Sequence, residues 1–375
     1  MTMLRRQLVR TGLLAVGGLS LAACSSGRSA ARTSASTPVP DQQGWYMPPE
    51  GAPHAKTWMA FGASAAIWGP KLVPIVRKNL ATIATTIARF EPVSMLVRRD
   101  EMDIARALVG PTVDLVVAPL DDLWIRDTGP VFVTGEGTRR AVDLNFNGWG
   151  GKQEHRRDAR IAPFVASYAG AELVTTELVM EGGAIEVDGE GTALITESSV
   201  LNGNRNPGKS KSDVEQELSR LLGIKKIIWL PGVAGKDITD GHTDFYARFA
   251  KPGTIVAGFE PDPTSFDHPV TTRHLEILKN STDARGRRLD IVQLAGPSVL
   301  RVEHPSDDFA AGYVNFYVCN GAVIAPQFGD PDSDKAASEK LQGLFPDRTV
   351  VQIDIDGIAA GGGGIHCTTQ QEPAQ

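Results

Sequence analysis

Five side chains of this sequence have the types needed for a nucleophilic substitution. They are one thiol, one imidazole and three carboxylates, each set close to glycines: Cys367, His242, Asp127, Glu181 and Asp244. A cysteine thiolate is a strong nucleophile, and a histidine can protonate a leaving group. Carboxylates deter anionic substrates, and two or three of them can form paired hydrogen bonds with a planar guanidinium. The set therefore favours cysteine chemistry on a cationic substrate.

The spacing of these residues suggests how they are presented. If His242 and Asp244 lie on an extended strand, they face the same side, so that Asp244 holds a substrate while His242 protonates it. Cys367 follows four glycines at 361–364, which would let the backbone pass close beside a substrate. His366 is a neighbour of Cys367, and neighbours on a strand face opposite sides. We therefore expect His366 to point away from the thiol. Each stretch alone could also be an ordinary turn, so the argument rests on the combination.

Helices and short strands alternate from about residue 44 onward. Such alternation predicts an α/β fold, and no Gly/Ser linker divides residues 44–375, so we expect a single domain. Residues 212–215 match a capping box. A weak echo between residues 181–185 and 361–365 is typical of a pseudo-symmetric propeller. The expected helix and strand pairs are 75–90 with 92–97, 101–109 with 112–118, 161–169 with 172–175, 212–222 with 227–230, 268–278 with 290–294, and 335–345 with 349–355.

Residues 1–23 are typical of an export signal. A double arginine, Arg5 and Arg6, precedes an apolar run that is too short for a comfortable membrane span. The run ends in Leu-Ala-Ala-Cys, which resembles a bacterial lipobox, and the two arginines resemble a twin-arginine signal. We expect cleavage before Cys24, lipidation of Cys24, a flexible tether over 24–43, and attachment to the outer face of the bacterial cytoplasmic membrane. The alternative is an uncleaved anchor helix.

Charge and cysteine content narrow the choice of partners. The chain has 375 residues and a formal net charge of −6, and loss of the signal's three arginines and no acids would move it to −9. An acidic surface argues against nucleic acid and for small cations. Cys319 lies in an apolar run and is expected to be a buried strand residue. A disulfide framework is therefore not expected, and Cys367 is expected to be a free thiol.

A series of ordered motifs runs through most of residues 44–375. Together they resemble the agmatine deiminase and bacterial peptidyl-arginine deiminase family, within the guanidino-group-modifying superfamily. The resemblance implies a five-bladed, pseudo-symmetric α/β propeller (a pentein-like fold) and no metal or organic cofactor. The motifs lie at 46–50, 126–127, 145–147, 149–151, 181–183, 187–192, 204–207, 241–244, 313–317, 326–331 and 365–371.

The resemblance also implies a role for each candidate residue. Cys367 would be the nucleophile and His242 the general acid and base. Asp127 and Asp244 would hold the guanidinium nitrogens, while Glu181 would either position the guanidinium or orient His242. We further expect the substrate to be bound by Trp124, Trp149 and Arg126. The rings of Trp45, Trp68 and Trp149 could flank an aliphatic tail, or they could be ordinary core residues.

The predicted function is hydrolytic deimination through a covalent amidino-thioether on Cys367. Agmatine, giving N-carbamoylputrescine and ammonia, is the first choice of substrate, and peptidyl-arginine is the runner-up. The chain has Ala60-Phe61-Gly62 where plant-type members have Gly-Trp-Pro, and Phe245 and Gly364 where they have Asn. These positions border the part of the pocket that reads the far end of the substrate, and the export signal also favours the runner-up.

Three other functions remain to be compared with deimination. A guanidino-binding lipoprotein would need the carboxylates but not the thiol. A metal hydrolase built on His242, Asp244 and His366 has no His-x-His or Cys-x-x-Cys spacing to support it. Amidino transfer to an amine is a further chemistry of the superfamily. A homodimer is left open.

Overall fold

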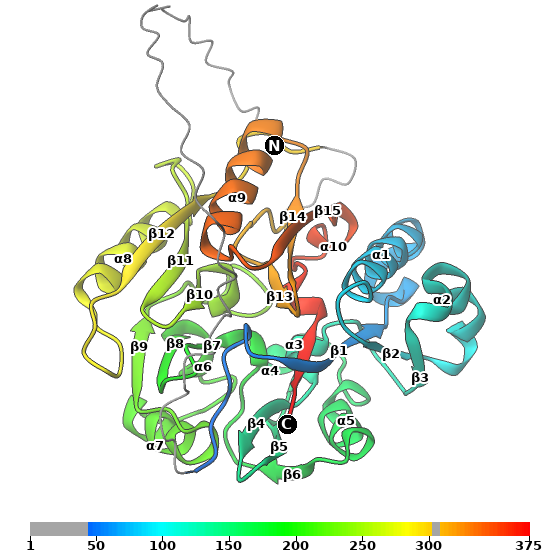
Figure 1. Ribbon diagram of the computed structural model, residues 1–375, viewed down its shortest axis with the longest axis horizontal. Coiled ribbons are helices and arrows are strands. Elements are labelled where there is room, and N and C mark those ends of the chain that lie inside the picture. Colours follow the sequence, from blue (N-terminus) through cyan, green and yellow to red (C-terminus); the bar gives the residue numbers. More distant parts are fainter. Residues whose placement is uncertain (1–43, 302–307) are drawn as a thin grey trace, which may run out of the picture. The chain divides into compact units, whose positions relative to one another are not determined.

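The described strands form five separate small sheets (Figure 1). The structure is a computed structural model that describes residues 44–301 and 308–375, and these belong to one compact unit. The expected signal peptide (1–23), the lipidation site Cys24 and the tether up to residue 43 lie outside the described residues. The sheets have the strand orders β16-β1-β2-β3, β4-β5-β6, β7-β8-β9, β10-β11-β12 and β13-β14-β15.

The strands are short, with three to eight residues each. Their bounds are β1 His54–Phe61, β2 Val93–Val97, β3 Asp114–Val117, β4 Val131–Gly135, β5 Thr138–Asp143, β6 Glu172–Thr175, β7 Ile185–Val187, β8 Thr192–Thr196, β9 Lys226–Leu230, β10 Ala247–Lys251, β11 Thr254–Phe259, β12 Asp290–Ala295, β13 Tyr317–Cys319, β14 Ala322–Gln327, β15 Thr349–Asp354 and β16 Gln370–Pro373.

One pairing pattern recurs in all five sheets of the described chain. An antiparallel pair is followed by a parallel neighbour, as where β4 pairs antiparallel with β5 and β5 pairs parallel with β6. The first sheet obeys the same rule with strands from distant parts of the sequence. There β16 runs antiparallel to β1, and β1 runs parallel to β2. The sheets are therefore five variants of one unit.

Parallel neighbours require a crossover connection, and a helix provides it in each sheet. Figure 1 shows these helices on the outside of the sheets. The α/β alternation expected from the sequence is confirmed, and all six expected helices are present. They are α1 Ala65–Ile87, α2 Met102–Val109, α5 Ile161–Ala169, α7 Lys211–Leu222, α8 His268–Asn280 and α9 Pro331–Leu344.

Helix α1 shows how the helices are held on the sheets. Its residues Val76, Leu80, Ile83 and Ile87 are spaced by four, three and four positions, so they form one apolar stripe. All four are completely buried and belong to the same hydrophobic cluster as Met95 of β2. Each such side chain contributes about 1.5–3 kcal/mol through removal from water. The sheets and their outer helices thus form a rigid scaffold for the connecting turns.

Some element ends differ from the expected ones, and α1 and α7 are two examples. Helix α1 begins ten residues before the expected start, because its first part continues through two prolines and across a kink at Gly69, where φ is 70°. The capping box of α7 is formed by Ser210 and Asp213, two residues before the expected box at 212–215. Cys319 is a buried strand residue as predicted, and both Cys319 and Cys367 are free.

In the strand orders given above, the first strands are β16, β4, β7, β10 and β13. A short helical turn precedes each of the first four, and a loop that contains Asn315 precedes β13. The echo between 181–185 and 361–365 is not the structural repeat, because Ile185 begins a strand whereas Ile365 precedes a turn. The turns are α3 Ile125–Thr128 before β4, η4 Gly182–Ala184 before β7, η5 Thr243–Phe245 before β10 and η6 His366–Thr368 before β16.

The remaining short helices connect these units.

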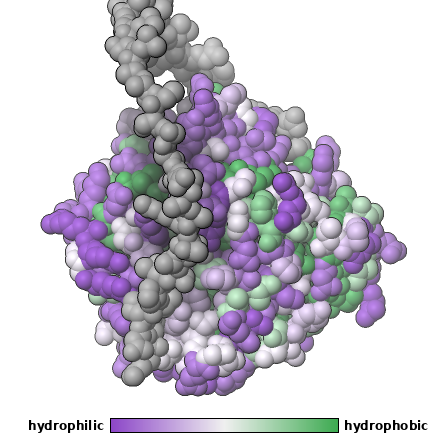
Figure 2. Space-filling view, in the orientation of Figure 1, coloured by the Kyte–Doolittle hydropathy of each residue, from purple (hydrophilic) through white to green (hydrophobic). Residues whose placement is uncertain are grey.

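Figure 2 shows a face with mixed hydrophilic and hydrophobic residues, and the exposed large hydrophobic residues include Ile104 and Leu108 of α2. Within residues 44–301 and 308–375, none of the helices has the length and apolarity needed to cross a bilayer. The short elements are α4 Gly148–Gly151, α6 Glu197–Val200, α10 Asp356–Ala359, η1 Arg99–Glu101, η2 Gly110–Thr112 and η3 Asp158–Arg160.

Candidate active site

The five candidate residues come together because each lies in or beside one of these turns. Cys367 lies in η6 and is 7% exposed. Its Sγ lies 3.5 Å from Oδ2 of Asp244 and 3.3 Å from Nδ2 of Asn315, which donates to it. Burial and the nearby charges of Asp244 and Asp127 raise the pKa of the Cys367 thiol well above its usual value. The thiol is therefore protonated at neutral pH.

His242 is held between two carboxylates. Its Nε2 lies 3.1 Å from Oε2 of Glu181, and its Nδ1 lies 3.7 Å from Oδ1 of Asp127. Burial alone would lower the pKa of His242, but these two carboxylates outweigh it and raise the pKa to about 9. The imidazole is thus a cation at neutral pH. Of the two roles considered for Glu181, the geometry favours orienting His242.

Glu181 is itself fixed from behind by a buried cation. Arg205 donates from Nε to Oε1 of Glu181 at 2.9 Å and from Nη1 to Asp240 at 2.7 Å. Burial raises the pKa of Glu181, but hydrogen bonds from His242 and Arg205 bring it below its usual value. Glu181 is therefore ionised, and both of its oxygens are engaged by the protein.

Asp127 is oriented by one side chain and one backbone group. Its Oδ2 accepts a hydrogen bond from Nε1 of Trp149 at 3.0 Å, and its Oδ1 accepts one from the N–H of Gly183 at 3.1 Å. Trp149 has a left-handed backbone with φ of 54°, an uncommon conformation for a bulky residue. Burial raises the pKa of Asp127 to about 6, with the charge of His242 opposing the shift.

Asp244 has one bound oxygen and one free oxygen. Its Oδ2 accepts a hydrogen bond from Nδ1 of His366 at 2.8 Å. Its Oδ1 is buried and has no hydrogen-bond partner among the described residues. Burial raises the pKa of Asp244, but His366 and His242 outweigh it, so the pKa lies below its usual value. A buried carboxylate oxygen without a donor is costly, and an incoming N–H donor would satisfy it.

Two of the geometric expectations were wrong. His242 and Asp244 do not share a strand face, because residues 243–245 form the turn η5. His366 does not point away from the site, because residues 366–368 form the turn η6 instead of an extended strand. A turn of this kind brings His366, Cys367 and Asp244 into one cluster.

Arg126 makes its hydrogen bonds to residues other than Asp127, Glu181 and Asp244. It donates to Gln371 at 2.8 Å, to Glu50 at 3.1 Å and to the carbonyl of His366 at 3.3 Å. Its Nε and both terminal nitrogens are thus used inside the protein. The expectation that Arg126 binds substrate is therefore not supported, and its contacts instead hold the turn that carries Cys367.

The tryptophans divide into two groups. Trp124 and Trp68 have ring centroids 5.7 Å apart, and Nε1 of Trp68 donates to Asp122 at 2.7 Å. Trp124 packs against the glycine run before Cys367, and Trp149 contacts Asp127. Trp45 lies elsewhere, with Cζ of Arg140 3.9 Å from the centroid of its ring. Trp124 and Trp149 therefore adjoin the site, whereas Trp45 packs against Arg140.

Three residues of the site were missed by sequence reasoning. Asn315 accepts the N–H of His366 at 3.0 Å and donates to Cys367. Arg205 supports Glu181, and Glu50 lies 2.8 Å from Nε2 of His366. All three occur in the motifs that carry the resemblance but were given no role there. Their polar side chains inside these motifs were the feature of the sequence that could have indicated a role in the site.

The glycine run before Cys367 is explained by close packing. A Cβ on Gly363 would overlap the ring of Trp124, and a Cβ on Gly364 would overlap the amide of Asn315. Only Gly362 of this run has a positive φ, at 85°. The expectation of a close backbone approach is therefore correct, but the groups approached are an aromatic ring and an amide.

Gly183 offers a direct test of the space in this site. A methyl group there would lie 2.7 Å from Nδ1 of His242 and 2.8 Å from Oδ1 of Asp127, and the backbone of Gly183 is not left-handed. We expect Gly183→Ala to lower kcat/KM on the order of 100-fold, because small displacements of catalytic groups are costly. Gly203→Ala, where nothing lies within 4 Å, is the control and should keep full activity. Equal activity of the two variants in steady-state assays would contradict the geometry.

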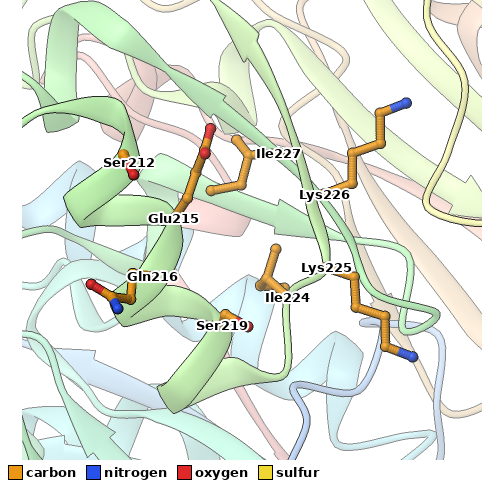
Figure 3. A pocket seen from close by; sticks show the side chains of 8 residues that line it. All are labelled: Ser212, Glu215, Gln216, Ser219, Ile224, Lys225, Lys226 and Ile227. Atoms are coloured by element: carbon orange, nitrogen blue, oxygen red, sulfur yellow. The ribbon is translucent and has the colours of Figure 1, made fainter.

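A separate surface pocket of about 520 Å³ lies between α7 and β9 (Figure 3). Figure 3 shows Lys225 and Lys226 extending away from α7, and Lys226 donates to Thr282 at 2.8 Å. None of the five candidate residues lines this pocket. In the part of the chain that the structure describes, no group of three or more His, Cys, Asp or Glu side chains is arranged to hold a metal ion.

A thiol beside an imidazole and three carboxylates defines a cysteine-dependent site for a cation. The family model described as Porphyromonas-type peptidyl-arginine deiminase matches residues 46–373, and the chain belongs to this family. A protein of Streptomyces coelicolor is 48% identical over 336 residues, covering 87% of this chain and 98% of its own. The agmatine deiminase of Stutzerimonas stutzeri is 38% identical over 362 residues, covering 90% and 98%.

A solved structure gives the same result for the fold. The agmatine deiminase of Enterococcus faecalis matches with a TM-score of 0.82 and 32% identity, covering 92% of this chain and 99% of that one. The resemblance derived from the sequence motifs is thereby confirmed.

Proposed function

We infer that the protein is a hydrolase that deiminates a guanidino substrate, with agmatine converted to N-carbamoylputrescine and ammonia. The observation that carries this inference is the buried, unpartnered Oδ1 of Asp244 beside Cys367 and Asp127. A guanidinium supplies planar N–H donors and a positive charge that match two carboxylates. The agmatine deiminases among the relatives support agmatine as the substrate.

The first half of the reaction forms the covalent intermediate. The cationic substrate, bound to Asp127 and Asp244, offsets the carboxylates that raise the pKa of Cys367, so that the thiol releases its proton to solvent and the thiolate becomes favoured. The thiolate attacks the guanidinium carbon and forms a C–S bond. His242, a cation at neutral pH, protonates the departing nitrogen as the C–N bond breaks. Ammonia leaves, and an amidino-thioether on Cys367 remains.

The second half hydrolyses this intermediate. His242, now neutral, takes a proton from water, and the oxygen attacks the amidino carbon. The C–S bond breaks, the ureido product forms, and Cys367 leaves as the thiolate. Glu181 keeps His242 oriented through both steps, and the carboxylates stabilise positive charge by preorganised electrostatics.

The fold proposed for this function is a closed five-bladed propeller with pseudo-five-fold symmetry. The repeated pairing pattern of the five sheets supports it. Further support comes from the placement of Asp127, Glu181, Asp244, Asn315 and Cys367, which each precede the first strand of a different sheet. In such a propeller, five equivalent turns would meet at the axis and form one site.

The test of the function is a substrate panel with ureido-product detection. The full chain would be given agmatine, free arginine and a peptide with an internal arginine. Turnover of agmatine alone supports the proposal. Turnover of the peptide would instead favour the runner-up, a peptidyl-arginine deiminase, as the family description suggests. Binding of agmatine without any product would favour the guanidino-binding lipoprotein.

The pH dependence of kcat/KM should show two limbs. Below pH 6 Asp127 takes a proton and loses the charge that attracts the substrate, so the rate falls with decreasing pH. Above pH 9 His242 loses its proton and cannot protonate the leaving nitrogen, so the rate falls again. We expect midpoints near 6 and 9, measured by initial rates in a constant-ionic-strength buffer.

A tryptophan variant tests whether the low-pH midpoint of the kcat/KM profile belongs to Asp127. Trp149→Phe removes the indole hydrogen bond that lowers the pKa of Asp127, so the acid midpoint should move to higher pH. Trp229→Phe removes a hydrogen bond to Glu215 in α7 and should leave the profile unchanged. If the two variants shifted the acid midpoint equally, the assignment to Asp127 would be wrong.

The proposal for cellular location rests on the sequence alone. The lipobox and the double arginine support export, cleavage before Cys24 and lipidation of Cys24. Expression of the full chain with a labelled fatty acid should label the wild type but not Cys24→Ala. An unlabelled protein that stays in the cytoplasmic fraction would contradict this proposal.

A further inference from the structure

His366 is bound between two ionised carboxylates. Its Nδ1 lies 2.8 Å from Oδ2 of Asp244, and its Nε2 lies 2.8 Å from Oε2 of Glu50. An ionised carboxylate only accepts hydrogen bonds, so both ring nitrogens must donate. His366 is only 1% exposed, and with both nitrogens engaged neither is available to act as a base.

Glu50 is itself held in place by several donors, so it can fix the ring of His366. Its Oε1 accepts from Nη2 of Arg248 at 2.8 Å and from the N–H of Val318 at 2.7 Å. Its Oε2 also accepts from Arg126 at 3.1 Å. Burial raises the pKa of Glu50, but Arg248, His366 and Arg126 bring it well below its usual value. The carboxylate is thus a fixed anion behind His366.

We propose that Glu50 and His366 form a positioning pair that holds Asp244 ionised, with Oδ2 bound and Oδ1 left for the substrate. The proposal goes beyond the reaction sequence above and rests on the proposed function for its substrate. The chain of contacts runs from Glu50 through His366 to Asp244, and its last free acceptor is the buried Oδ1. His366 acts through Asp244 and is not itself a catalytic residue.

The pair also affects the ionisation of the Cys367 thiol before substrate binds. The Sγ of Cys367 lies 3.5 Å from the same oxygen of Asp244 that His366 binds. The charge on Asp244, with that on Asp127, disfavours the thiolate until a cation arrives. Loss of His366 would leave Asp244 buried without its main partner, so Asp244 would take up a proton. The thiol would then ionise more easily, although the site would bind its cation less well.

Loss of His366 should weaken substrate binding but make the Cys367 thiol more reactive. A purely structural role would not raise the reactivity of the thiol, so the two measurements together distinguish positioning from structural support. In His366→Leu we expect kcat/KM for agmatine to fall on the order of 100-fold, mainly through KM. In the same variant without substrate, iodoacetamide should alkylate Cys367 about tenfold faster at pH 7.5, as the thiolate displaces iodide. Mass spectrometry identifies Cys367 as the alkylated residue. His366→Asn keeps a donor near Nδ1 and should show smaller changes of both kinds.

The matched control is His274→Leu, which removes a buried histidine of α8 that accepts a hydrogen bond from the N–H of Gly232 and packs its ring against Tyr246. It should change neither rate. Alkylation in His366→Leu that is unchanged or slower, with a normal circular dichroism spectrum, would overturn the proposal. If His366→Leu does not fold, His366→Asn decides by the same two rates. If wild type does not turn over agmatine, the proposed function fails while the alkylation rates still test the pair.

Discussion

Cys367→Ala should abolish deimination of agmatine, with a loss of at least about 10⁴-fold in kcat, while agmatine still binds. The large loss is expected because no other nucleophile can form the covalent intermediate. Binding should survive because Asp127 and Asp244 keep their supports, which are Trp149 and His366. The measurements are ureido-product formation and calorimetric titration with agmatine.

Cys319→Ala is the matched control for this experiment. Cys319 is the other free thiol of the described chain, and it is buried at the end of β13. Its replacement should cost about 1 kcal/mol of stability through lost packing and leave kcat unchanged. If Cys367→Ala retained turnover, or if Cys319→Ala lost it, the covalent role of Cys367 would be untenable.

Arg248→Met should lower the free energy of unfolding by about 3–5 kcal/mol. Arg248 is completely buried and binds Glu186 at 2.7 Å, Glu50 at 2.8 Å and the carbonyl of Phe316 at 2.7 Å. Methionine fills similar space but leaves both carboxylates buried without this cation. Urea unfolding followed by tryptophan fluorescence gives the free energy, with unchanged slope as the two-state check.

An exposed arginine provides the comparison. Arg273 of α8 forms an ion pair with Glu276 at 2.9 Å, and both side chains are more than half exposed. Arg273→Met should cost less than about 1 kcal/mol, since solvent screens such pairs. A loss of similar size in both variants would mean that the buried network around Glu50 contributes no more than a surface pair.

The regular elements were largely predictable because they follow local patterns. Helix α5 and strand β6 have the bounds expected from the sequence. Helix α9 begins at Pro331, four residues before the expected start, although Asp330 followed by proline is a good helix-start signal. The early start of α1 was missed because two prolines normally argue against a helix interior.

The site was predictable in its residue types but not in its connections. Cys367, His242 and the three acids could be chosen because their chemistry is complementary. The hydrogen bond from His366 to Asp244 depends on the turn η6, and extended geometry was assumed there. The supports from Glu50 and Arg205 join segments far apart in sequence, and a single sequence contains no distances between such segments.

The pairing of β1 with β16 places His54 opposite Pro373, so folding must close a loop that contains nearly all of the described chain. Long-range closure of this kind is entropically costly and slow. Cys367 lies just before β16 and Glu50 lies just before β1, so the nucleophile and the anchor of His366 become ordered by the same late event. Catalytic activity should thus be the last property gained on refolding. It should also be the first property lost when the pairing of β1 with β16 opens.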